Sequence, residues 1–134
     1  MKFSCSGQDF EIPDAWLTAA GVFGWIALAE CYVATADSCH PTAVIPLDSI
    51  APPVRDDGIR WFDKDRMVRI LQGLRCGTRL PPIEIHELPD ELIFRYSIRN
   101  GFHRFYASAA LGFTHIPVTV YPYFTFDSEL SAIR

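Results

Sequence analysis

Residues 96–107 carry the most informative pattern in the sequence and read Tyr96-Ser97-Ile98-Arg99-Asn100-Gly101-Phe102-His103-Arg104-Phe105-Tyr106-Ala107. The apolar and aromatic residues of segment 92–98 predict a β-strand, and a short helix is expected from about His103 to Leu111, ending at Gly112. A tight turn at Gly101 joins the two, because glycine adopts backbone conformations that other residues avoid. Backbone N–H groups at a helix start, reinforced by the helix dipole, favour a bound anion. The turn is therefore a candidate phosphate loop.

Two basic side chains follow this turn directly. A cation in the first turn of a helix is unfavourable for the helix itself, and such local conflicts tend to mark functional positions. Arg104 can clamp phosphate oxygens through its guanidinium fork, and His103 can donate to a phosphate or move a proton near neutral pH. A purely structural alternative pairs Arg99 and Arg104 with neighbouring carboxylates and lets His103 bond a buried carbonyl group.

The segments around the turn predict further strands and one longer helix. Strands are expected at residues 44–47, 83–86 and 116–120, the second of them as the hairpin partner of segment 92–98 through a turn at 88–91. Residues 56–58 are typical of a turn. A helix is expected from Asp63 to Gly77, because apolar residues recur on one of its faces. That face contains Phe62, Met67, Ile70, Leu71 and Leu74.

The first 43 residues predict short elements only. Residues 2–5 and 9–12 are expected to form a hairpin. A short helix should run from Asp14 to Ala20, with Asp14 in its first turn and Gly21 ending it. Residues 31–34 have the pattern of a further strand.

The composition indicates a packed domain with an uneven charge distribution. The chain has 134 residues, of which 49% are hydrophobic and 21% charged, enough for one compact domain rather than a disordered tail. The formal net charge of -4 disfavours broad binding to a DNA backbone. Residues 1–50, however, hold one basic and six acidic residues, whereas residues 55–104 hold ten basic and eight acidic residues. This positive segment contains the candidate phosphate loop and suits a small polyphosphate.

The start of the chain and the cysteines indicate a reducing compartment. Residues 1–5 lack the pattern of a secretory signal, and the apolar run 15–29 is too short for a membrane span. We therefore expect a cytoplasmic protein without a membrane partner and with reduced thiols. A zinc site at Cys31, Cys39 and His40 lacks the paired cysteines typical of such sites. All four cysteines are therefore interpreted as core-filling residues.

In order and spacing, residues 44–120 resemble the ParB/sulfiredoxin superfamily. The resemblance rests on an ordered set of motifs: Ile45-Pro46, Pro52-Pro53-Val54-Arg55, the helix 63–77, Pro81-Pro82-Ile83-Glu84-Ile85, residues 96–108, Leu111-Gly112 and Ile116-Pro117-Val118. Residues 96–107 are especially similar to the sulfiredoxin active-site run Y-S-F-G-G-C-H-R-Y-A. The resemblance implies an α+β fold in which helices pack on a small mixed sheet within a single compact domain. Residues 1–43 would form a hairpin–helix extension packed on this domain, and residues 121–134 an aromatic tail.

The resemblance also implies a nucleotide site at the turn, because in that superfamily the loop and helix start bind nucleotide phosphates. By position, four residues would contact phosphate: Asn100, Gly101, His103 and Arg104. Arg66 and Arg69 correspond to nucleotide-binding side chains of the preceding helix, and Arg55 corresponds to an arginine of the ParB-type turn. For Arg66 and Arg69 the alternative is a solvent-exposed helix face.

Known activities of the superfamily depend on residues that this sequence replaces. Sulfiredoxins need a nucleophilic cysteine where this chain has Phe102, so sulfiredoxin activity is excluded. Partition-type ParB proteins have there a glutamate that helps to hold the metal of bound CTP. ParB-like free-serine kinases have an aspartate where this chain has Asn100, which cannot act as a general base. The candidate acids are instead Asp56, Asp57 and Glu84, and we expect no metal site made of protein ligands alone.

The sequence supports three hypotheses about function. The leading one is a small protein that binds a nucleoside di- or triphosphate with Mg²⁺, as a hydrolase or phosphotransferase with His103 and Arg104 as catalytic residues. The second is a nuclease or DNA-processing accessory of a mobile element, which the acidic net charge disfavours. The third is a non-catalytic interaction module, forming a homodimer or binding a partner through aromatic residues near both chain ends. These residues are Trp16, Phe23, Trp25, Tyr121, Tyr123, Phe124 and Phe126.

Overall fold

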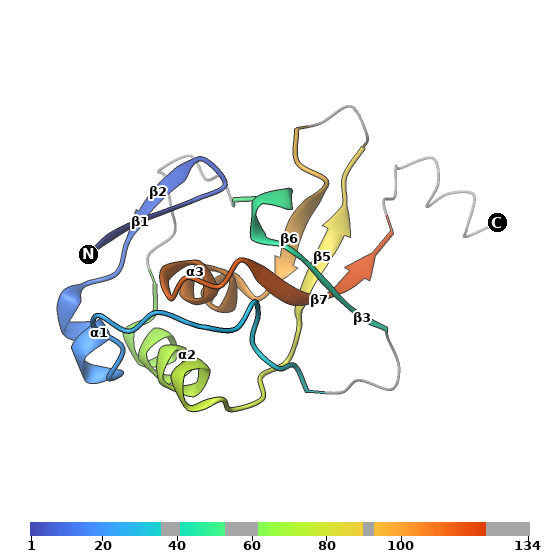
Figure 1. Cartoon of the computed structure of the whole chain (residues 1–134). Helices are drawn as coiled ribbons and strands as arrows, with labels where there is room; N and C mark the ends of the chain where they lie inside the picture. Colours follow the sequence, from blue (N-terminus) through green and yellow to red (C-terminus); the bar gives the residue numbers. More distant parts are fainter. Residues whose placement is uncertain (36–40, 53–61, 90–92, 123–134) are drawn as a thin grey trace.

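A five-stranded mixed sheet forms the centre of the structure. The computed structural model describes residues 1–35, 41–52, 62–89 and 93–122 (Figure 1). The strands of the sheet are β3 (Thr42–Pro46), β4 (Ile50–Ala51), β5 (Ile83–Glu87), β6 (Tyr96–Asn100) and β7 (His115–Tyr121). Their order is β3-β7-β5-β6-β4, with β7 antiparallel to β3 and parallel to β5. β5 pairs antiparallel with β6, and β6 pairs parallel with β4. The predicted strands at 44–47, 83–86 and 116–120 are confirmed, except that Leu47 begins the short 3-10 turn η1 (Leu47–Ser49).

Two helices, α2 (Lys64–Cys76) and α3 (Phe102–Ala110), pack against each other, and α3 also contacts β5. The side chain of Asp63 accepts a 2.9 Å hydrogen bond from the Arg66 N–H and so caps the start of α2. Gly77 ends this helix in a left-handed conformation with φ 74°. Met67, Leu71 and Leu74 are buried, which confirms the predicted apolar face.

The N-terminal segment packs on the same core. It contains the hairpin β1 (Lys2–Cys5) and β2 (Gln8–Glu11), followed by α1 (Asp14–Ala19), as predicted. The Phe10 ring lies 4.8 Å from the Tyr106 ring of α3, and the Tyr106 hydroxyl bonds Gln8 Oε1 over 3.2 Å. Together these elements confirm the predicted α+β class, with helices on a mixed sheet and an N-terminal hairpin.

Two predicted segments differ in the structure. Residues 31–34 do not form a strand, because their backbone pairs with Leu80 only, through an isolated bridge at Ala34. β6 begins at Tyr96 rather than at residue 92; just before it, the Arg95 N–H donates to the Ser49 carbonyl, and the Arg95 carbonyl accepts from the Leu88 N–H.

The cysteines also differ from the prediction. Cys5 is buried, but Cys31 is half-buried and Cys76 is exposed at the end of α2, so the described cysteines are not all core-filling residues. Cys39 and His40, the turn at 56–58 and most of the aromatic tail lie outside the described residues. Of the described helices, even the longest, α2 with 13 residues, falls short of the length and apolarity that would span a membrane.

Candidate functional site

Gly101 joins β6 to α3 and lies close to β5. Its φ of 114° and ψ of 27° lie in a region that favours glycine. A Cβ atom at this position would lie 2.4 Å from Ile83 Cγ2 and 3.2 Å from Ile83 Cα. The side of Gly101 that lacks a side chain therefore faces β5, so packing as well as backbone conformation requires glycine here.

His103, in the first turn of α3, is buried and connects the starts of the two helices. Its Nε2 accepts a hydrogen bond of 2.9 Å from the backbone N–H of Asp63, the N-cap residue of α2. In this arrangement the neutral ring carries its proton on Nδ1. The start of α2 therefore lies beside the start of α3, and the positive ends of two helix dipoles point to one region. The structural alternative expected the His103 ring to bond a buried carbonyl group. The ring does bond the backbone, but it accepts from an N–H group instead.

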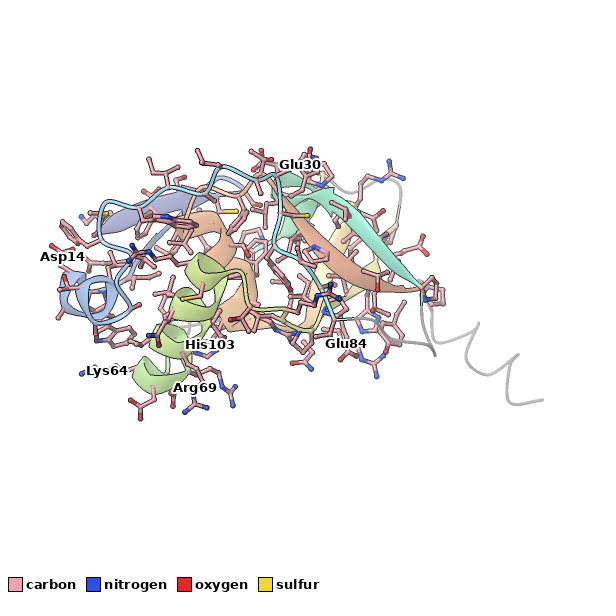
Figure 2. The ribbon with its side chains drawn as sticks, turned by 60° about the horizontal axis from the view of Figure 1, so that its bottom comes forward. Asp14, Glu30, Lys64, Arg69, Glu84 and His103 are labelled. Atoms are coloured by element: carbon pink, nitrogen blue, oxygen red, sulfur yellow. The ribbon has the colours of Figure 1, made fainter. Side chains whose placement is uncertain are left out.

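Three exposed cations lie in the first two turns of α2. They are Lys64, Arg66 and Arg69. Figure 2 shows Lys64 and Arg69 pointing outward from α2, with Lys64 on the side of the helix away from His103. Two acids also lie at the start of α2: Asp65 in its first turn, and the N-cap residue Asp63, whose carboxylate accepts from the Arg66 N–H. At the start of α3, among the described residues, no side chain caps the helix and its first turn holds no acid. The region therefore has the backbone donors and the positive charge that an anion requires.

Arg104 is half-buried and holds the segment that leads into β5. Its Nη1 donates to the carbonyl oxygens of Pro81 at 2.6 Å and Pro82 at 3.2 Å. The Tyr32 hydroxyl donates to the same Pro81 oxygen at 2.8 Å. Burial raises the pKa of Tyr32, so this hydroxyl stays a donor at neutral pH. Arg104 thus bonds backbone carbonyls and not the neighbouring carboxylates of the structural alternative.

Glu84 lies opposite Asn100 in the pairing of β5 with β6. Its Oε2 accepts a hydrogen bond of 3.1 Å from Asn100 Nδ2, and its Oε1 lies 3.7 Å from Arg99 Nε. These contacts lower the pKa of Glu84, first through the bond from Asn100, then through a bond from Tyr121 and the charges of Arg99 and Arg104. Glu84 is therefore an ionised carboxylate next to the Gly101 turn.

Tyr121 and Phe102 have roles that the sequence patterns did not suggest. The Arg99 guanidinium lies 4.2 Å from the centre of the Tyr121 ring, in a cation–π contact. Phe102 packs its ring 5.4 Å from Phe62 and 5.0 Å from Tyr106. The position that distinguishes the known activities of the superfamily therefore contributes packing in this chain.

The predicted site residues fall into two groups on either side of Gly101. His103, Arg66 and Arg69 belong to the start of the helix pair, whereas Asn100, Arg104 and Glu84 belong to the β5–β6 side. Arg55, Asp56 and Asp57 lie outside the described residues. Within the described part of the chain, no group of three or more histidines, cysteines or acids could hold a metal ion.

Comparisons with known proteins bear on the fold. No protein-family model matches the sequence, and no curated protein is significantly similar to it. The structure is similar to sulfiredoxin from Arabidopsis thaliana, with a TM-score of 0.51, 21% sequence identity, and coverage of 70% of this chain and 98% of that chain. It is also similar to the C-terminally truncated chromosome-partitioning protein ParB from Caulobacter crescentus, solved with CTP-gamma-S. That match has a TM-score of 0.50 and 22% identity, and covers 69% of this chain but only 51% of the ParB chain. The order of strands and helices around Gly101 and these two similarities together show that this chain has the ParB/sulfiredoxin fold.

Proposed function

We propose that this protein binds a nucleoside di- or triphosphate, with the phosphates at the adjoining N-termini of α2 and α3. The observation that carries the proposal is the hydrogen bond between the Asp63 N–H and His103 Nε2, which brings the two helix starts together. First-turn amides of α3 would donate to phosphate oxygens, and both helix dipoles would favour the negative charge. Arg66 and Arg69, exposed on α2, would neutralise it.

Two further observations support this assignment. The fold is similar to that of a ParB protein that was solved in complex with CTP-gamma-S. The charge distribution agrees as well, because residues 55–104 are net positive although the chain as a whole is acidic. A compact polyphosphate needs local positive charge only, whereas a DNA backbone would meet the acidic first fifty residues too.

A Mg²⁺-dependent hydrolase or phosphotransferase activity is the extension of this proposal. Besides N–H groups and cations, the helix starts hold only the carboxylates of Asp63 and Asp65, and within the described residues no group of three or more such ligands could hold a metal ion. Any Mg²⁺ would therefore enter with the nucleotide. Glu84 is the described candidate acid, and its lowered pKa keeps it ionised. Phosphoryl transfer requires mainly positioning and charge neutralisation, which Arg66, Arg69 and Arg104 would supply.

Isothermal titration calorimetry with ATP, ADP and CTP, with and without Mg²⁺, tests the proposal directly. Arg66→Ala and Arg69→Ala should each weaken binding about tenfold, because each removes a charge-assisted contact to phosphate. Arg95→Ala is the matched control, since Arg95 is exposed at the opposite end of β6 from Gly101. Equal affinities of all three variants and the wild type, or no binding of any nucleotide, would refute the assignment.

A further inference from the structure

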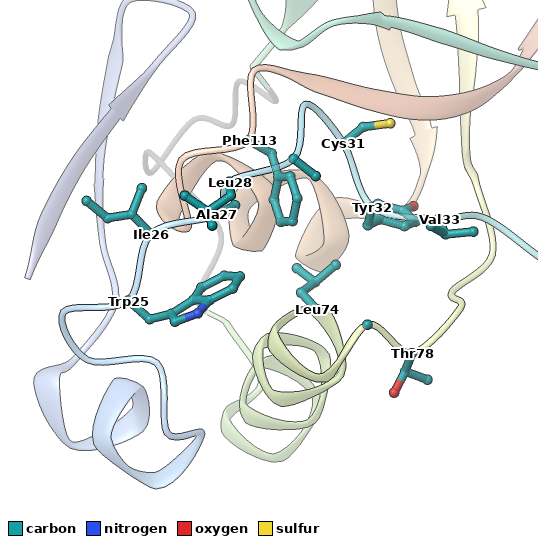
Figure 3. A pocket seen from close by; sticks show the side chains of 12 residues that line it. Trp25, Ile26, Ala27, Leu28, Cys31, Tyr32, Val33, Leu74, Thr78 and Phe113 are labelled. Carbon is teal, nitrogen blue, oxygen red and sulfur yellow. The ribbon is translucent and has the colours of Figure 1, made fainter.

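An apolar cavity of about 390 Å³ lies between residues 25–33 and the C-terminal end of α2. Tyr32, Leu74 and Phe113 are buried side chains that line it, and Figure 3 shows the Trp25 ring pointing toward Leu74 and Phe113. Other lining residues are exposed, so the cavity has a buried floor and an open mouth. A small molecule can therefore enter it without unfolding of the surrounding chain.

Backbone hydrogen bonds hold segment 25–33 in place at three points. Ala27 donates its N–H group, whereas Glu30 and Val33 accept at their carbonyl oxygens. Their partners, in this order, are the Leu111 carbonyl at 2.8 Å, the N–H groups of Thr114 and His115 at 3.1 and 3.0 Å, and the Leu80 N–H at 3.3 Å. The segment therefore cannot move inward and close the cavity unless it breaks these bonds.

The large apolar side chains of this segment leave the cavity unfilled. Leu28 is fully exposed, and the exposed fractions of Ile26 and Val33 are 71% and 57%. An unfilled apolar space forfeits dispersion contacts along its walls, and exposed apolar side chains remain in contact with water. Both costs fall on one segment, and such local conflicts tend to mark functional positions.

The lining restricts the charge of a ligand. Of the described residues that line the cavity, none is charged. The hydroxyl of Tyr32 already donates to the Pro81 carbonyl. A carboxylate, phosphate or ammonium group inside the cavity would lose its hydration without gaining an ionic partner, which is costly. The cavity therefore favours an uncharged ligand.

The volume of the cavity restricts the size of a ligand. An engineered apolar cavity of about 150 Å³ binds benzene. The present cavity is more than twice as large, and its volume lies near the lower end of the range of about 300–1,000 Å³ that is typical of small-molecule sites. It therefore has room for two rings, fused or directly linked.

We propose that this cavity is a binding site for a small uncharged molecule with two aromatic rings. Trp25, Tyr32 and Phe113 each contribute an aromatic ring to the lining, and aromatic rings prefer offset-stacked and edge-to-face contacts with one another. Leu74 supplies the aliphatic part of the floor. The ligand buries its apolar surface against these four side chains, and this burial is the main source of its affinity.

This site is separate from the proposed nucleotide site. The cavity lies at the C-terminal end of α2, whereas the phosphates of the nucleotide are assigned to the N-terminal end, and a helix of 13 residues is about 20 Å long. The uncharged lining also disfavours a nucleotide in the cavity. Failure of one proposal therefore leaves the other standing.

Fluorescence titration with the neutral naphthalene dye prodan tests the site. The wild type should bind one dye molecule per chain and shift its emission to shorter wavelength, as apolar surroundings do. Trp25→Ala should weaken binding about tenfold or more, because it removes one aromatic wall. Trp16→Ala is the matched control, since Trp16 is also a half-buried tryptophan packed against the core but does not line the cavity. Circular dichroism confirms that each variant is folded.

Amide chemical shifts locate the bound dye in the wild type, so this arm depends on no variant. Prodan should shift the NMR signals of residues 25–33, Leu74 and Phe113 and leave those of β6 unchanged. Shifts confined to another part of the protein would overturn the assignment to this cavity.

Competition tests the preference for uncharged ligands. Naphthalene should displace prodan, whereas naphthalenesulfonate, which has the same rings and a fixed negative charge, should be about tenfold less effective. Equal displacement by the two compounds would overturn the assignment to uncharged ligands. The absence of saturable prodan binding to the folded wild type would overturn the site itself, as would equal weakening by Trp25→Ala and Trp16→Ala.

Discussion

Replacing Gly101 by alanine should destabilise the fold even without any bound ligand. The new Cβ would lie 2.4 Å from Ile83 Cγ2 and 2.6 Å from Ile83 Cβ, well inside van der Waals contact. Overpacking of this kind costs about 1–3 kcal/mol. A non-glycine residue in a left-handed conformation costs roughly 1–2 kcal/mol more. We therefore expect Gly101→Ala to lower the free energy of unfolding by about 2–5 kcal/mol, against a total of about 5–15 kcal/mol for a typical domain.

Urea-induced unfolding followed by circular dichroism measures this loss, and Gly7→Ala serves as its control. Gly7 also has a positive φ, of 79°, but no atom lies within 4 Å of the position of its Cβ. Gly7→Ala should therefore show the conformational cost of about 1–2 kcal/mol without the clash. If Gly101→Ala were no more destabilising than Gly7→Ala, the close packing against β5 would be wrong as the reason for glycine. A fully stable Gly101→Ala that lost only nucleotide binding would instead assign the residue to phosphate approach alone.

Three further predictions concern buried or charged side chains. Ser108 is fully buried, and its Oγ has no hydrogen-bond partner in the described structure, so Ser108→Ala should raise the free energy of unfolding by about 1 kcal/mol; a loss of stability would contradict this. His103→Ala should lower it by about 1–3 kcal/mol, because the Asp63 N–H loses its acceptor, whereas the half-buried control His86→Ala should have a smaller effect in the same urea titration. The pKa of Glu84 is lowered from 4.5 in the folded state, so its contribution to stability is present above that value and disappears as the pH falls through the folded pKa. Glu84→Gln should therefore make the free energy of unfolding less dependent on pH on the acid side, and an unchanged pH profile would show that the contacts with Asn100 and Arg99 contribute nothing.

Elements with strong local signals were predictable from the sequence. The apolar period of α2 and the terminating Gly77 are each readable within a few neighbouring residues, and the structure confirms both. The strand at residues 31–34 was wrong for a physical reason. Its alternation matches a strand, but a strand also needs a neighbour, and here only one bridge to Leu80 forms.

The arrangement of the candidate site was only partly predictable. The sequence identified Gly101, His103 and Glu84, but not the contacts that define their roles, because those contacts join distant segments. The bond between His103 and Asp63 spans 40 residues, and that between Glu84 and Asn100 spans 16. The second contact was missed as well, because the predicted turn at 88–91 pairs Glu84 with Arg95, whereas in the structure Glu87 pairs with Tyr96 and Glu84 with Asn100. The first depends on how α2 packs on α3, which no local pattern encodes.

The position of β7 in the sheet has a consequence for the newly synthesised chain. β7 follows the other four strands in sequence, yet it lies between β3 and β5 and pairs with both. At typical synthesis rates of about 5–20 residues per second, the roughly 70 residues from the end of β3 to the start of β7 take about 4–14 s to appear. During that interval β3 lacks the strand that it pairs with, and β5, once synthesised, exposes the edge that β7 later covers. A nascent chain arrested before residue 115 should therefore bind chaperones and aggregate, whereas one arrested after β7 has left the ribosome should resist protease.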